Sequence, residues 1–381
     1  MPQVLHTITG LNVGGAEIML TRLVGRMDQA GFPSTVLSLL PAGAMAASLP
    51  QRHANLHSLS MQRARPRSRN VLDLRRLVRQ QSPDIIHGWM YHGNMAGSLG
   101  SLLSFTFAPV IWSVHHTIAD IAVEEPKMHR LIRFSAMLSH LAAAICYCSR
   151  IAARQHEHLG FNARRSAVIP NGIDTDAFYP TRSRRAHLRA TLNIPPERRI
   201  IGHFARYHPM KDQVNLVRAV SVLIADGHDV QLVIAGEGHE NGPVRDAARD
   251  LAIDDRVTTL GLRHDVAELL PGLDVFVLSS AWGEAFSLAA GEAMASGVPA
   301  VVTDVGDSGW LVGPTGVVVP PREPHALAAG LARLLVLAAE DRQALGAAAR
   351  ERVVNRFSLQ KYVESHVSLY EKVLEGEGRR R

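Results

Sequence analysis

Short apolar runs, each bounded by turn residues, alternate with longer segments of helical spacing along most of the sequence. Examples are VLHTIT, DIIHGWM and VIWSVHH in the first half, and IIGHFAR, VQLVIAG and DVFVLSS in the second. Most intervening segments are long enough for a crossover helix, and this order predicts parallel sheets covered by helices on both faces. The expected fold class is therefore α/β.

The alternation pauses once, over a stretch rich in proline, asparagine and arginine, PNGIDTDAFYPTRSRRAHLRATLNIPPERR. A chain of 381 residues favours two domains, at roughly 150 residues each, and the pause is typical of an interdomain linker. We expect an N-terminal domain over residues 1–175, a linker over 176–196, a C-terminal domain over 197–356, and a terminal helix with a charged tail over 357–381.

The composition is that of a globular protein, with 46% hydrophobic and 20% charged residues. Apolar runs stay below the ~20 residues that span a bilayer, and the start MPQVLHTITG reads as a strand rather than a signal peptide. We therefore expect a cytoplasmic protein. Cys146 and Cys148 are too close for a CxxC redox motif, which favours two reduced thiols in the core.

Positive charge is concentrated in the first half of the chain. Residues 1–185 hold 20 Lys and Arg against 10 Asp and Glu, and the remainder holds 21 against 25. Seven arginines lie within one short segment: Arg63, Arg65, Arg67, Arg69, Arg75, Arg76 and Arg79. The Arg63–Arg79 segment is either a solvated loop and helix face or a surface attracted to anionic lipid at the inner membrane face. We expect no nucleic-acid partner, because no aromatic-interleaved basic motif accompanies it.

A glycine pair, Gly14 and Gly15, follows the first strand and opens a helix within GLNVGGAEIML. Glycines allow close approach of a ligand, and the free N–H groups of a helix N-terminus attract phosphate. A tight turn without a ligand explains the pair equally well. Neither this spacing nor GEGHENG, with Gly236 and Gly238, matches GxGxxG, which weighs against a dinucleotide-binding dehydrogenase.

Histidines lie at the ends of two predicted strands. His115 and His116 end IWSVHHT, and His92 lies in HGWMYHGN. Open α/β sheets bind ligands at this edge, and strand alternation turns His115 and His116 to opposite sides, so that one of them at most faces a site. The alternative is an ordinary hydrogen-bonded loop histidine. The HEH sequence at 156–158 has no third ligand nearby, so we expect no metal there.

Two cations, Arg206 and Lys211, bracket the turn that follows another strand, in GHFARYHPMKDQ. An arginine fork and a compact lysine charge suit a diphosphate, although ordinary surface charge gives the same pattern.

Glu284 and Glu292 lie eight residues apart in EAFSLAAGEAMASGVPAVVTDVG. In a continuous helix their Cα atoms would be ~12 Å apart along the axis, which does not suit a pair of glycosidase carboxylates. We expect the helix to begin near Ser287 and to end at Gly297, leaving Glu284 in the preceding loop. Two carboxylates so placed suit the two ends of an elongated ligand, with sugar hydroxyls as hydrogen-bond donors and a phosphate at the helix N-terminus.

The same segment resembles the E-x7-E motif of the family-4 retaining glycosyltransferases, which include enzymes of polysaccharide biosynthesis and glycogen-synthase-like enzymes. The resemblance extends through GLNVGGAE, HGWMYHGN, WSVHHT, PNGIDTDAFYP, RYHPMKD, IAGEGHE and GLRHDVAELLPGLDVFVLSS, in the family's order. It implies two Rossmann-like domains facing across a cleft (the GT-B fold) and a C-terminal helix that crosses back to the N-terminal domain. The implied activity is that of a retaining hexosyltransferase that uses a nucleoside-diphosphate sugar, in cell-surface polysaccharide, lipopolysaccharide or glycolipid biosynthesis.

The resemblance also implies roles for individual residues. Glu284 would contact hydroxyls of the donor sugar, Glu292 the ribose, and Arg206 and Lys211 the diphosphate. His115 would contact the sugar near the reacting carbon, with His116 as the fallback and His92 on the acceptor side. Further donor contacts are implied for Gly14, Gly15, Gly236, Glu237, Gly238, Arg263, Phe286, Ser287 and Leu288. We therefore take His115, Arg206, Lys211 and Glu284 as the candidate catalytic residues.

Two features depart from the family pattern or imitate another one. Ala285, Phe286, Ser287 and Leu288 stand where the family has Gly-Phe-Pro-Asn, so phosphate contact there falls to the backbone or to the Ser287 hydroxyl. The sequence Asp174-Thr-Asp176 imitates a metal-binding DxD motif but lies within the family's linker signature. We expect no metal and no cofactor beyond the nucleotide-sugar co-substrate.

Two other functions are compatible with the same fold. A nucleotide-sugar epimerase or hydrolase would turn over the donor without an acceptor, and a non-catalytic scaffold would bind no nucleoside diphosphate. The predicted acceptor is a saccharide or a polyprenyl-linked saccharide at the inner membrane face, because the arginine segment and the apolar run MAGSLGSLLSFTFAPVIW both fall in the N-terminal domain.

Overall fold

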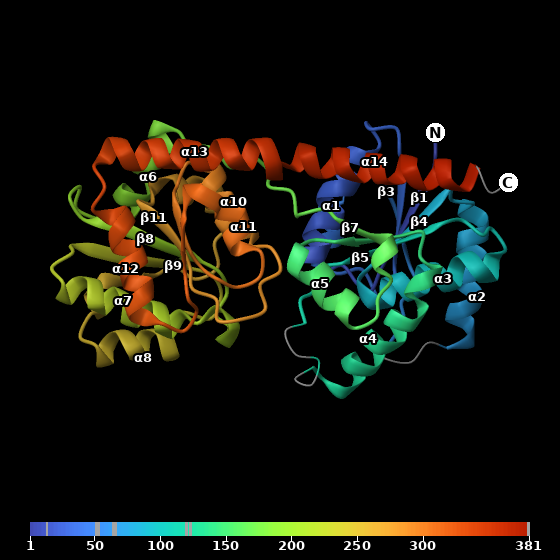
Figure 1. Cartoon of the computed structure of the whole chain (residues 1–381), viewed down its shortest axis with the longest axis horizontal. Coiled ribbons are helices and arrows are strands. Elements are labelled where there is room, and N and C mark those ends of the chain that lie inside the picture. Colours follow the sequence, from blue (N-terminus) through green and yellow to red (C-terminus); the bar gives the residue numbers. More distant parts are fainter. Residues whose placement is uncertain (13, 50–53, 63–66, 119–120, 122–123, 379–381) are drawn as a thin grey trace. The chain divides into compact units, whose positions relative to one another are not determined.

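The computed structural model describes residues 1–12, 14–49, 54–62, 67–118, 121 and 124–378 of the chain. It divides into two compact units (Figure 1). Unit 1 combines Met1–Gly172 with Leu359–Arg381, and unit 2 is Ile173–Ser358. The chain therefore passes into unit 2 at Gly172 and returns to unit 1 at Leu359.

Unit 1 is built on a seven-stranded parallel sheet in the order β3-β2-β1-β4-β5-β6-β7. Its strands are β1 (Val4–Ile8), β2 (Ser34–Ser38), β3 (Ala54–Ser58), β4 (Ile85–Trp89), β5 (Val110–Val114), β6 (Ala144–Tyr147) and β7 (Ser166–Val168). Its helices are α1 (Gly15–Met27), α2 (Ser68–Gln81), α3 (Met90–Ser104), α4 (Pro126–Leu138), α5 (Arg150–His158) and α14 (Leu359–Gly378), with short 3-10 turns η1 (Ala44–Ser48), η3 (Ser139–Leu141) and η4 (Ala163–Arg165).

The strand order places the helices of unit 1 on opposite faces of its sheet. Right-handed crossovers carry the chain from β1 outward to β3 on one side and from β4 outward to β7 on the other. As a result, α1 covers one face, and α2, α3 and α4 cover the other. The packing agrees with this arrangement, because α3 contacts both α2 and α4, whereas α14 contacts α1.

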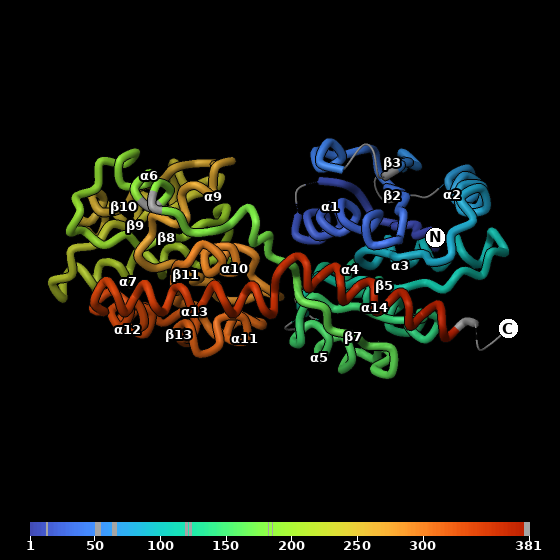
Figure 2. Tube along the Cα trace, turned by 90° about the horizontal axis from the view of Figure 1, so that it is seen from above, coloured from blue at the N-terminus to red at the C-terminus, as the bar shows by residue number. Residues whose placement is uncertain are grey.

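The C-terminal helix α14 is part of unit 1 through buried polar and aromatic contacts. The Tyr370 hydroxyl lies 2.7 Å from Nδ1 of His87 on β4, and Nε2 of His87 lies 2.7 Å from the Ser113 hydroxyl on β5. His366 is buried on the same helix, next to Cys146. Figure 2 shows α14, in red, lying along unit 1. The predicted return of the C-terminal helix to the N-terminal domain is confirmed.

Unit 2 has a six-stranded parallel sheet in the order β10-β9-β8-β11-β12-β13. Its strands are β8 (Arg199–Phe204), β9 (Val230–Ala235), β10 (Val257–Thr259), β11 (Val275–Leu278), β12 (Ala300–Thr303) and β13 (Val317–Val319). Its helices are α6 (Arg182–Leu192), α7 (Gln213–Ala225), α8 (Pro243–Asp250), α9 (Val266–Leu269), α10 (Leu288–Ala295), α11 (Ser308–Val312), α12 (Pro324–Leu335) and α13 (Ala339–Phe357), with 3-10 turns η5 (Pro209–Lys211), η6 (Asp254–Arg256), η7 (Leu270–Gly272) and η8 (Gly313–Thr315).

Both faces of the unit 2 sheet are buried, as the continuous apolar runs predicted. Successive residues of β11 belong to two different hydrophobic clusters: Phe276 and Leu278 to one, Val275 and Val277 to the other. This alternation is what a strand covered by helices on both sides requires. The α/β fold class with two parallel-sheet domains is confirmed.

The segment 176–196, expected as a linker, contains α6 and belongs to unit 2. Leu188 on α6 is fully buried, and Arg189 donates to the Asp274 carboxylate at 2.8 Å. The helix packs on η7 and α9. The segment is rich in arginine, and one buried leucine does not give the apolar periodicity that would predict a helix packed against a core.

The two cysteines are buried and unbridged, as expected for core thiols. Among the described residues, no helix combines the length and the apolar character that a bilayer crossing requires.

Unit 1 should lose stability on acidification before unit 2. Burial lowers the pKa of His6 and His115 to about 3 and that of His366 to about 4, from an ordinary value of 6.5. Below pH 6.5 the unfolded chain therefore binds protons that folded unit 1 excludes. The contribution of these histidines to stability is complete above pH 6.5 and is lost as the pH falls toward their folded pKa values. The loss is about 2 kcal/mol per histidine at pH 5.

Hydrogen exchange of the β4 and β8 amides between neutral pH and pH about 5 measures this difference, with exchange rates corrected for intrinsic pH dependence. In unit 2, burial lowers the pKa of His203 in the same way. Equal loss of protection in both units would contradict the prediction.

Candidate functional site

An ion pair between Lys211 and Glu284 joins the segments that follow two neighbouring strands of unit 2. Nζ of Lys211, in η5 after β8, contacts Oε1 of Glu284, in the loop after β11. The Ser280 hydroxyl donates to the same carboxylate oxygen at 2.6 Å. Glu284 is only 7% exposed, so the carboxylate is desolvated and needs both partners. This pair brings the segment RYHPMKD and the loop that carries Glu284 together in space.

Backbone contacts hold the two segments in register. The Ser279 hydroxyl donates to the Lys211 carbonyl at 2.7 Å, and the Ala281 amide donates to the Met210 carbonyl at 2.8 Å. The segment after β12 closes the loop from the other side at Gly306. This glycine has a φ of +62°, and a Cβ there would lie 1.9 Å from the Glu284 carbonyl oxygen. Only glycine fits, because the backbone conformation and the close approach both exclude a side chain.

Helix α10 begins where the sequence predicted, at Leu288, with Ser287 as its N-cap. The Ser287 hydroxyl accepts a hydrogen bond from the Ala290 amide at 3.3 Å. Phe286 is buried against Trp310 and Phe357, and the half-buried Leu288 packs on the same core cluster. The side chains of Phe286 and Leu288 are therefore engaged in the fold, which leaves backbone N–H groups and the O–H of Ser287 as the donors here.

Glu292 lies in the second turn of α10 and is half-buried. It is separated from Glu284 by the helix start, as the sequence analysis expected. The geometry therefore agrees with two separate tasks for the carboxylates rather than one shared reaction centre.

Arg206 and the glycine turn after β9 lie at the same edge of the sheet. Arg206 is exposed after β8. A Cβ on Gly236 would lie 2.1 Å from the Ala205 carbonyl oxygen, and the Tyr207 amide donates to the Glu237 carbonyl at 2.8 Å. These contacts place the 236–238 turn next to the segment that carries Arg206. Glu237 and Gly238 are exposed, so this turn is accessible from solvent.

Arg263, after β10, forms a two-point ion pair with Asp265, at 2.8 Å and 2.5 Å. The hydrogen bonds from Arg263 lower the pKa of Asp265. A ligand at Arg263 has to share or displace this carboxylate, which distinguishes Arg263 from the exposed Arg206.

The predicted residues of unit 1 lie at the carboxyl edge of its sheet. Gly14 and Gly15 begin α1, where Gly14 is extended and the Glu17 side chain lies close above it: a Cβ on Gly14 would be 2.4 Å from Glu17 Oε2. Burial raises the pKa of Glu17. Any anion at this helix start therefore meets a carboxyl group that is easier to protonate than an ordinary glutamic acid.

His115 and His116 have different partners on opposite sides of the β5 end. His115 stacks on Trp89, with ring centroids 5.3 Å apart, and Trp89 in turn donates from Nε1 to His6 at 3.1 Å. Burial lowers the pKa of His115 to about 3, which keeps its ring neutral. His116 instead lies 3.1 Å from the Tyr91 hydroxyl and 3.4 Å from the Glu124 carboxylate, and His92 is exposed in the first turn of α3.

Ser280 and Trp89 are partners of the candidate catalytic residues that the sequence analysis did not single out. Ser280 shares the Glu284 carboxylate with Lys211, and Trp89 holds the ring of His115. Both lie at or just after the carboxyl end of a parallel strand, β11 and β4. That position was the available signal, because ligands of open α/β sheets gather there.

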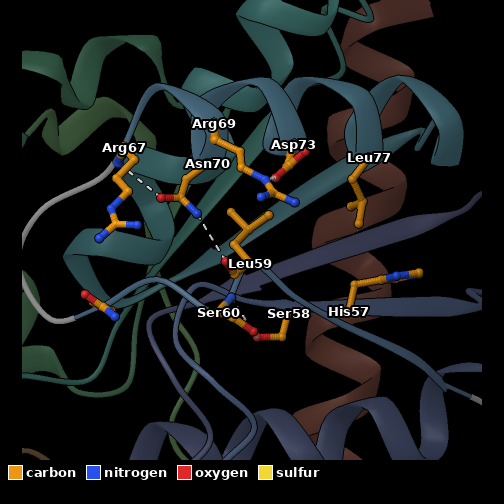
Figure 3. Close-up of a pocket in the computed structure, with 10 residues that line it drawn as sticks. His57, Ser58, Leu59, Ser60, Arg67, Arg69, Asn70, Asp73 and Leu77 are labelled. Carbon is orange, nitrogen blue, oxygen red and sulfur yellow. Dashed lines mark hydrogen bonds and ion pairs between the residues drawn. The ribbon is translucent and has the colours of Figure 1, made fainter.

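The arginine segment lines a separate cavity of about 490 Å3 in unit 1, between the end of β3 and the first half of α2 (Figure 3). Asn70 fixes this helix start: its Oδ1 accepts from the Arg67 amide at 3.0 Å, and its Nδ2 donates to the Leu59 carbonyl at 3.1 Å. Arg69 pairs loosely with Asp73 at 3.7 Å. Arg63 and Arg65 of the predicted segment lie outside the described residues.

Asp174 and Asp176 form a turn at the start of unit 2. Oδ1 of Asp174 accepts from the amides of Asp176 and Ala177, at 3.2 Å and 3.1 Å. This is a local Asx turn, which is the structural role expected for the DTD sequence. Within the described part of the chain, no group of three or more His, Cys, Asp or Glu is placed to hold a metal ion.

Two protein families match the chain, one in each half. Residues 13–177 match the family described as Glycosyltransferase Family 4, and residues 184–352 match Glycosyl transferases group 1. The chain belongs to this superfamily of glycosyltransferases. Its biochemical class is therefore that of a transferase.

Individual relatives of this glycosyltransferase agree with the assignment. EpsF of Bacillus subtilis, named as a glycosyltransferase, is 28% identical over 79% of both chains. An Escherichia coli enzyme named UDP-Gal:alpha-D-GlcNAc-diphosphoundecaprenol alpha-1,3-galactosyltransferase is 25% identical over 64% of each. Among solved structures, Anabaena HepE in complex with UDP superimposes with a TM-score of 0.84 at 20% identity, over 98% of this chain and all of HepE, and has also been solved with UDP-glucose. The GT-B fold is thereby confirmed.

A double-mutant cycle on Lys211→Met and Glu284→Gln should reveal strong coupling. Either single change leaves the other group buried without its partner, which costs about 3–5 kcal/mol in unit 2, whereas the double change should cost less than the sum. Urea-dependent hydrogen exchange of the β8 and β11 amides measures the free energy of unfolding of unit 2 in each variant.

The matched control is the exposed pair of Arg249 and Asp246, 3.2 Å apart on α8. Its cycle should give a coupling energy of about 0.3–0.5 kcal/mol, which is typical of exposed pairs on a helix. A Lys211 and Glu284 coupling no larger than this value would show that the ion pair does not hold the loop.

Proposed function

We propose that this glycosyltransferase is a retaining enzyme that moves a sugar from a nucleoside-diphosphate sugar to an acceptor hydroxyl without a metal ion. The observation that carries the proposal is the ion pair of Lys211 with Glu284, held by Ser280 and placed beside the start of α10. It brings a cation, a sugar-binding carboxylate and free helix N–H groups to neighbouring strand ends of one sheet.

The transition state of such a transfer develops negative charge on the leaving diphosphate. Lys211, held by Glu284, and the first N–H groups of α10 would supply positive charge for it from fixed positions, and the exposed Arg206 would add a second cation. Groups that are already oriented cost no reorganisation when the charge forms. A metal ion is therefore not needed to neutralise the leaving group.

The state of Glu284 argues against a role as covalent nucleophile. Its Oε1 is engaged by the Lys211 ammonium and the Ser280 hydroxyl. A carboxylate so stabilised is a weak nucleophile but a good acceptor for sugar hydroxyls. We propose a same-face reaction, in which the bond from the anomeric carbon to the phosphate oxygen breaks, the acceptor oxygen bonds to that carbon, and the departing phosphate takes the acceptor proton.

The remaining roles that we propose are those implied by the family resemblance. Glu292, one to two turns inside α10, would hold the ribose. The 236–238 turn and Arg263 would lie near the nucleotide, with Gly14 and Gly15 assisting at the diphosphate and His115 at the sugar. The complexes of HepE with UDP and UDP-glucose support a nucleoside-diphosphate donor.

We propose a saccharide acceptor, carried on a polyprenyl diphosphate at the inner membrane face. The support is the Escherichia coli relative, whose name specifies a diphosphoundecaprenol-linked acceptor, together with the basic surface of unit 1. The product would belong to cell-surface polysaccharide, lipopolysaccharide or glycolipid biosynthesis.

Replacement of Lys211 by Ala should reduce kcat/KM at least ~100-fold, because it removes a cation from the developing charge of the leaving group. Release of nucleoside diphosphate from UDP-, GDP- and ADP-sugars, with membrane extract as the acceptor source and EDTA throughout, measures the rate. Arg249→Ala, an exposed cation of unit 2, is the matched control and should keep the wild-type rate.

Two results would contradict the proposal. Donor turnover that does not depend on acceptor would indicate an epimerase or hydrolase, and the absence of binding to any nucleoside diphosphate in titration calorimetry would indicate a scaffold.

The two glutamates should differ in their kinetic effects. Glu292→Gln should mainly raise KM for the donor, because the ribose contact is equal in the ground state and the transition state. Glu284→Gln should mainly lower kcat, because it also removes the partner that holds Lys211 in position. Steady-state kinetics with varied donor concentration separates the two, and identical losses in both variants would contradict the division of tasks.

A further inference from the structure

An exposed apolar patch lies at one edge of unit 1. Its members follow or end α3 and α4: Leu102, Phe105, Phe107, Phe134, Met137 and Leu141. Phe105, Met137 and Leu141 are 67%, 63% and 69% exposed. Contiguous apolar side chains at this level of exposure mark an interaction surface rather than ordinary surface variation.

The register of the sheet shows that both halves of the patch lie at the same edge. Phe107 lies shortly before β5 and Leu141 shortly before β6, and these strands pair with Ile111 opposite Ala144. The Ala143 amide also donates to the Val110 carbonyl at 2.8 Å. Since α3 contacts α4 and both helices end at this amino edge of the sheet, the patch draws on two neighbouring helices.

The aromatic tip of the patch is held in place by the local structure. Phe105 and Phe107 have φ values of +61° and +49°, which bulky side chains rarely adopt, and their rings meet edge to face at 6.1 Å. The Ser101 hydroxyl donates to the Ala108 carbonyl at 2.8 Å and fixes the loop. An unfavourable backbone that presents two phenylalanines to solvent, in a loop pinned by hydrogen bonds, points to a functional role.

Positive charge predominates on the helices next to the patch. Helices α2, α3 and α4 are described over their whole length and carry one carboxylate, Asp73. Against it they carry seven exposed cations: Arg69, Arg75, Arg76, Arg79, Lys127, Arg130 and Arg133. The Arg75 guanidinium lies 5.8 Å from the centre of the Phe105 ring, so the basic surface and the apolar patch adjoin.

We propose that this patch and its flanking cations dock unit 1 on a bilayer that contains anionic lipid. A second copy of the chain is a poor occupant, because a two-fold interface would bring the same cations face to face. An anionic bilayer satisfies both features, since its interface takes up the apolar side chains and its headgroups attract the arginines. The proposal goes beyond the proposed function, because it concerns the amino edge of the unit 1 sheet, opposite the carboxyl edge that carries Gly14, Gly15 and His115.

Flotation of the full chain with vesicles tests the proposal without turnover. Recovery should be high with equimolar phosphatidylcholine and phosphatidylglycerol at low salt, and low with phosphatidylcholine alone. Phe105→Ser with Phe107→Ser, and separately Arg75→Gln with Arg76→Gln and Arg79→Gln, should each weaken partitioning to the anionic vesicles at least about tenfold.

The matched control changes two exposed apolar residues of unit 2, Leu262→Ser and Val336→Ser, and should float like the wild type. Circular dichroism and thermal unfolding should show that every variant is folded. The proposal is overturned if wild-type recovery is equal with neutral and anionic vesicles or absent with both, if the unit 2 control loses as much as the phenylalanine variant, or if sedimentation equilibrium shows a dimer that only the phenylalanine variant abolishes.

Vesicle binding needs neither donor nor acceptor. An enzyme that floats normally but transfers no sugar would therefore contradict the proposed function alone, whereas an active enzyme that fails to float would contradict the docking surface alone.

Discussion

The ion pair between Lys211 and Glu284 is the interaction on which the candidate site depends. Two charges that are mostly removed from water are stable together only when their geometry and remaining hydrogen bonds are satisfied, and Ser280 supplies the additional hydrogen bond here. The pair in turn sets the position of the loop before α10, and so the direction of the N–H groups at the start of that helix. Loss of either charge would therefore disturb this loop and the helix start together.

Unit 1 is organised around a different constraint, the return of the C-terminal helix. α14 contributes Tyr370 and His366 to a buried set of rings that includes His6, His87 and Trp89. The three histidines of this set remain neutral because burial lowers their pKa values. Trp89 connects this set to His115, so the last helix of the chain supports the residue expected to face the sugar.

The sequence analysis and the structure agree best where local patterns are strong. The β11 run, the start of α10 at Leu288 and the loop position of Glu284 all follow from apolar periodicity and helix-capping chemistry. They differ at α6, where the sequence suggested a linker and the structure has a packed helix. Its many arginines leave Leu188 as an isolated apolar position, so the apolar pattern is too weak to predict a packed helix. The helix is stabilised by its ion pair with Asp274 and by packing on η7, and both lie far away in sequence.

The sequence by itself determined the α/β class, the two parallel sheets, the family and the residue types of the site, because each depends on short-range periodicity or on a motif that is contiguous in the chain. The tertiary structure decided which of those residues are free to act. It paired Lys211 with Glu284, used Phe286 in the core, occupied Arg263 with Asp265 and exposed two phenylalanines, with Arg75 beside one of them, at one edge of unit 1. These outcomes depend on contacts between segments that are distant in sequence, and no local pattern encodes the distance between them.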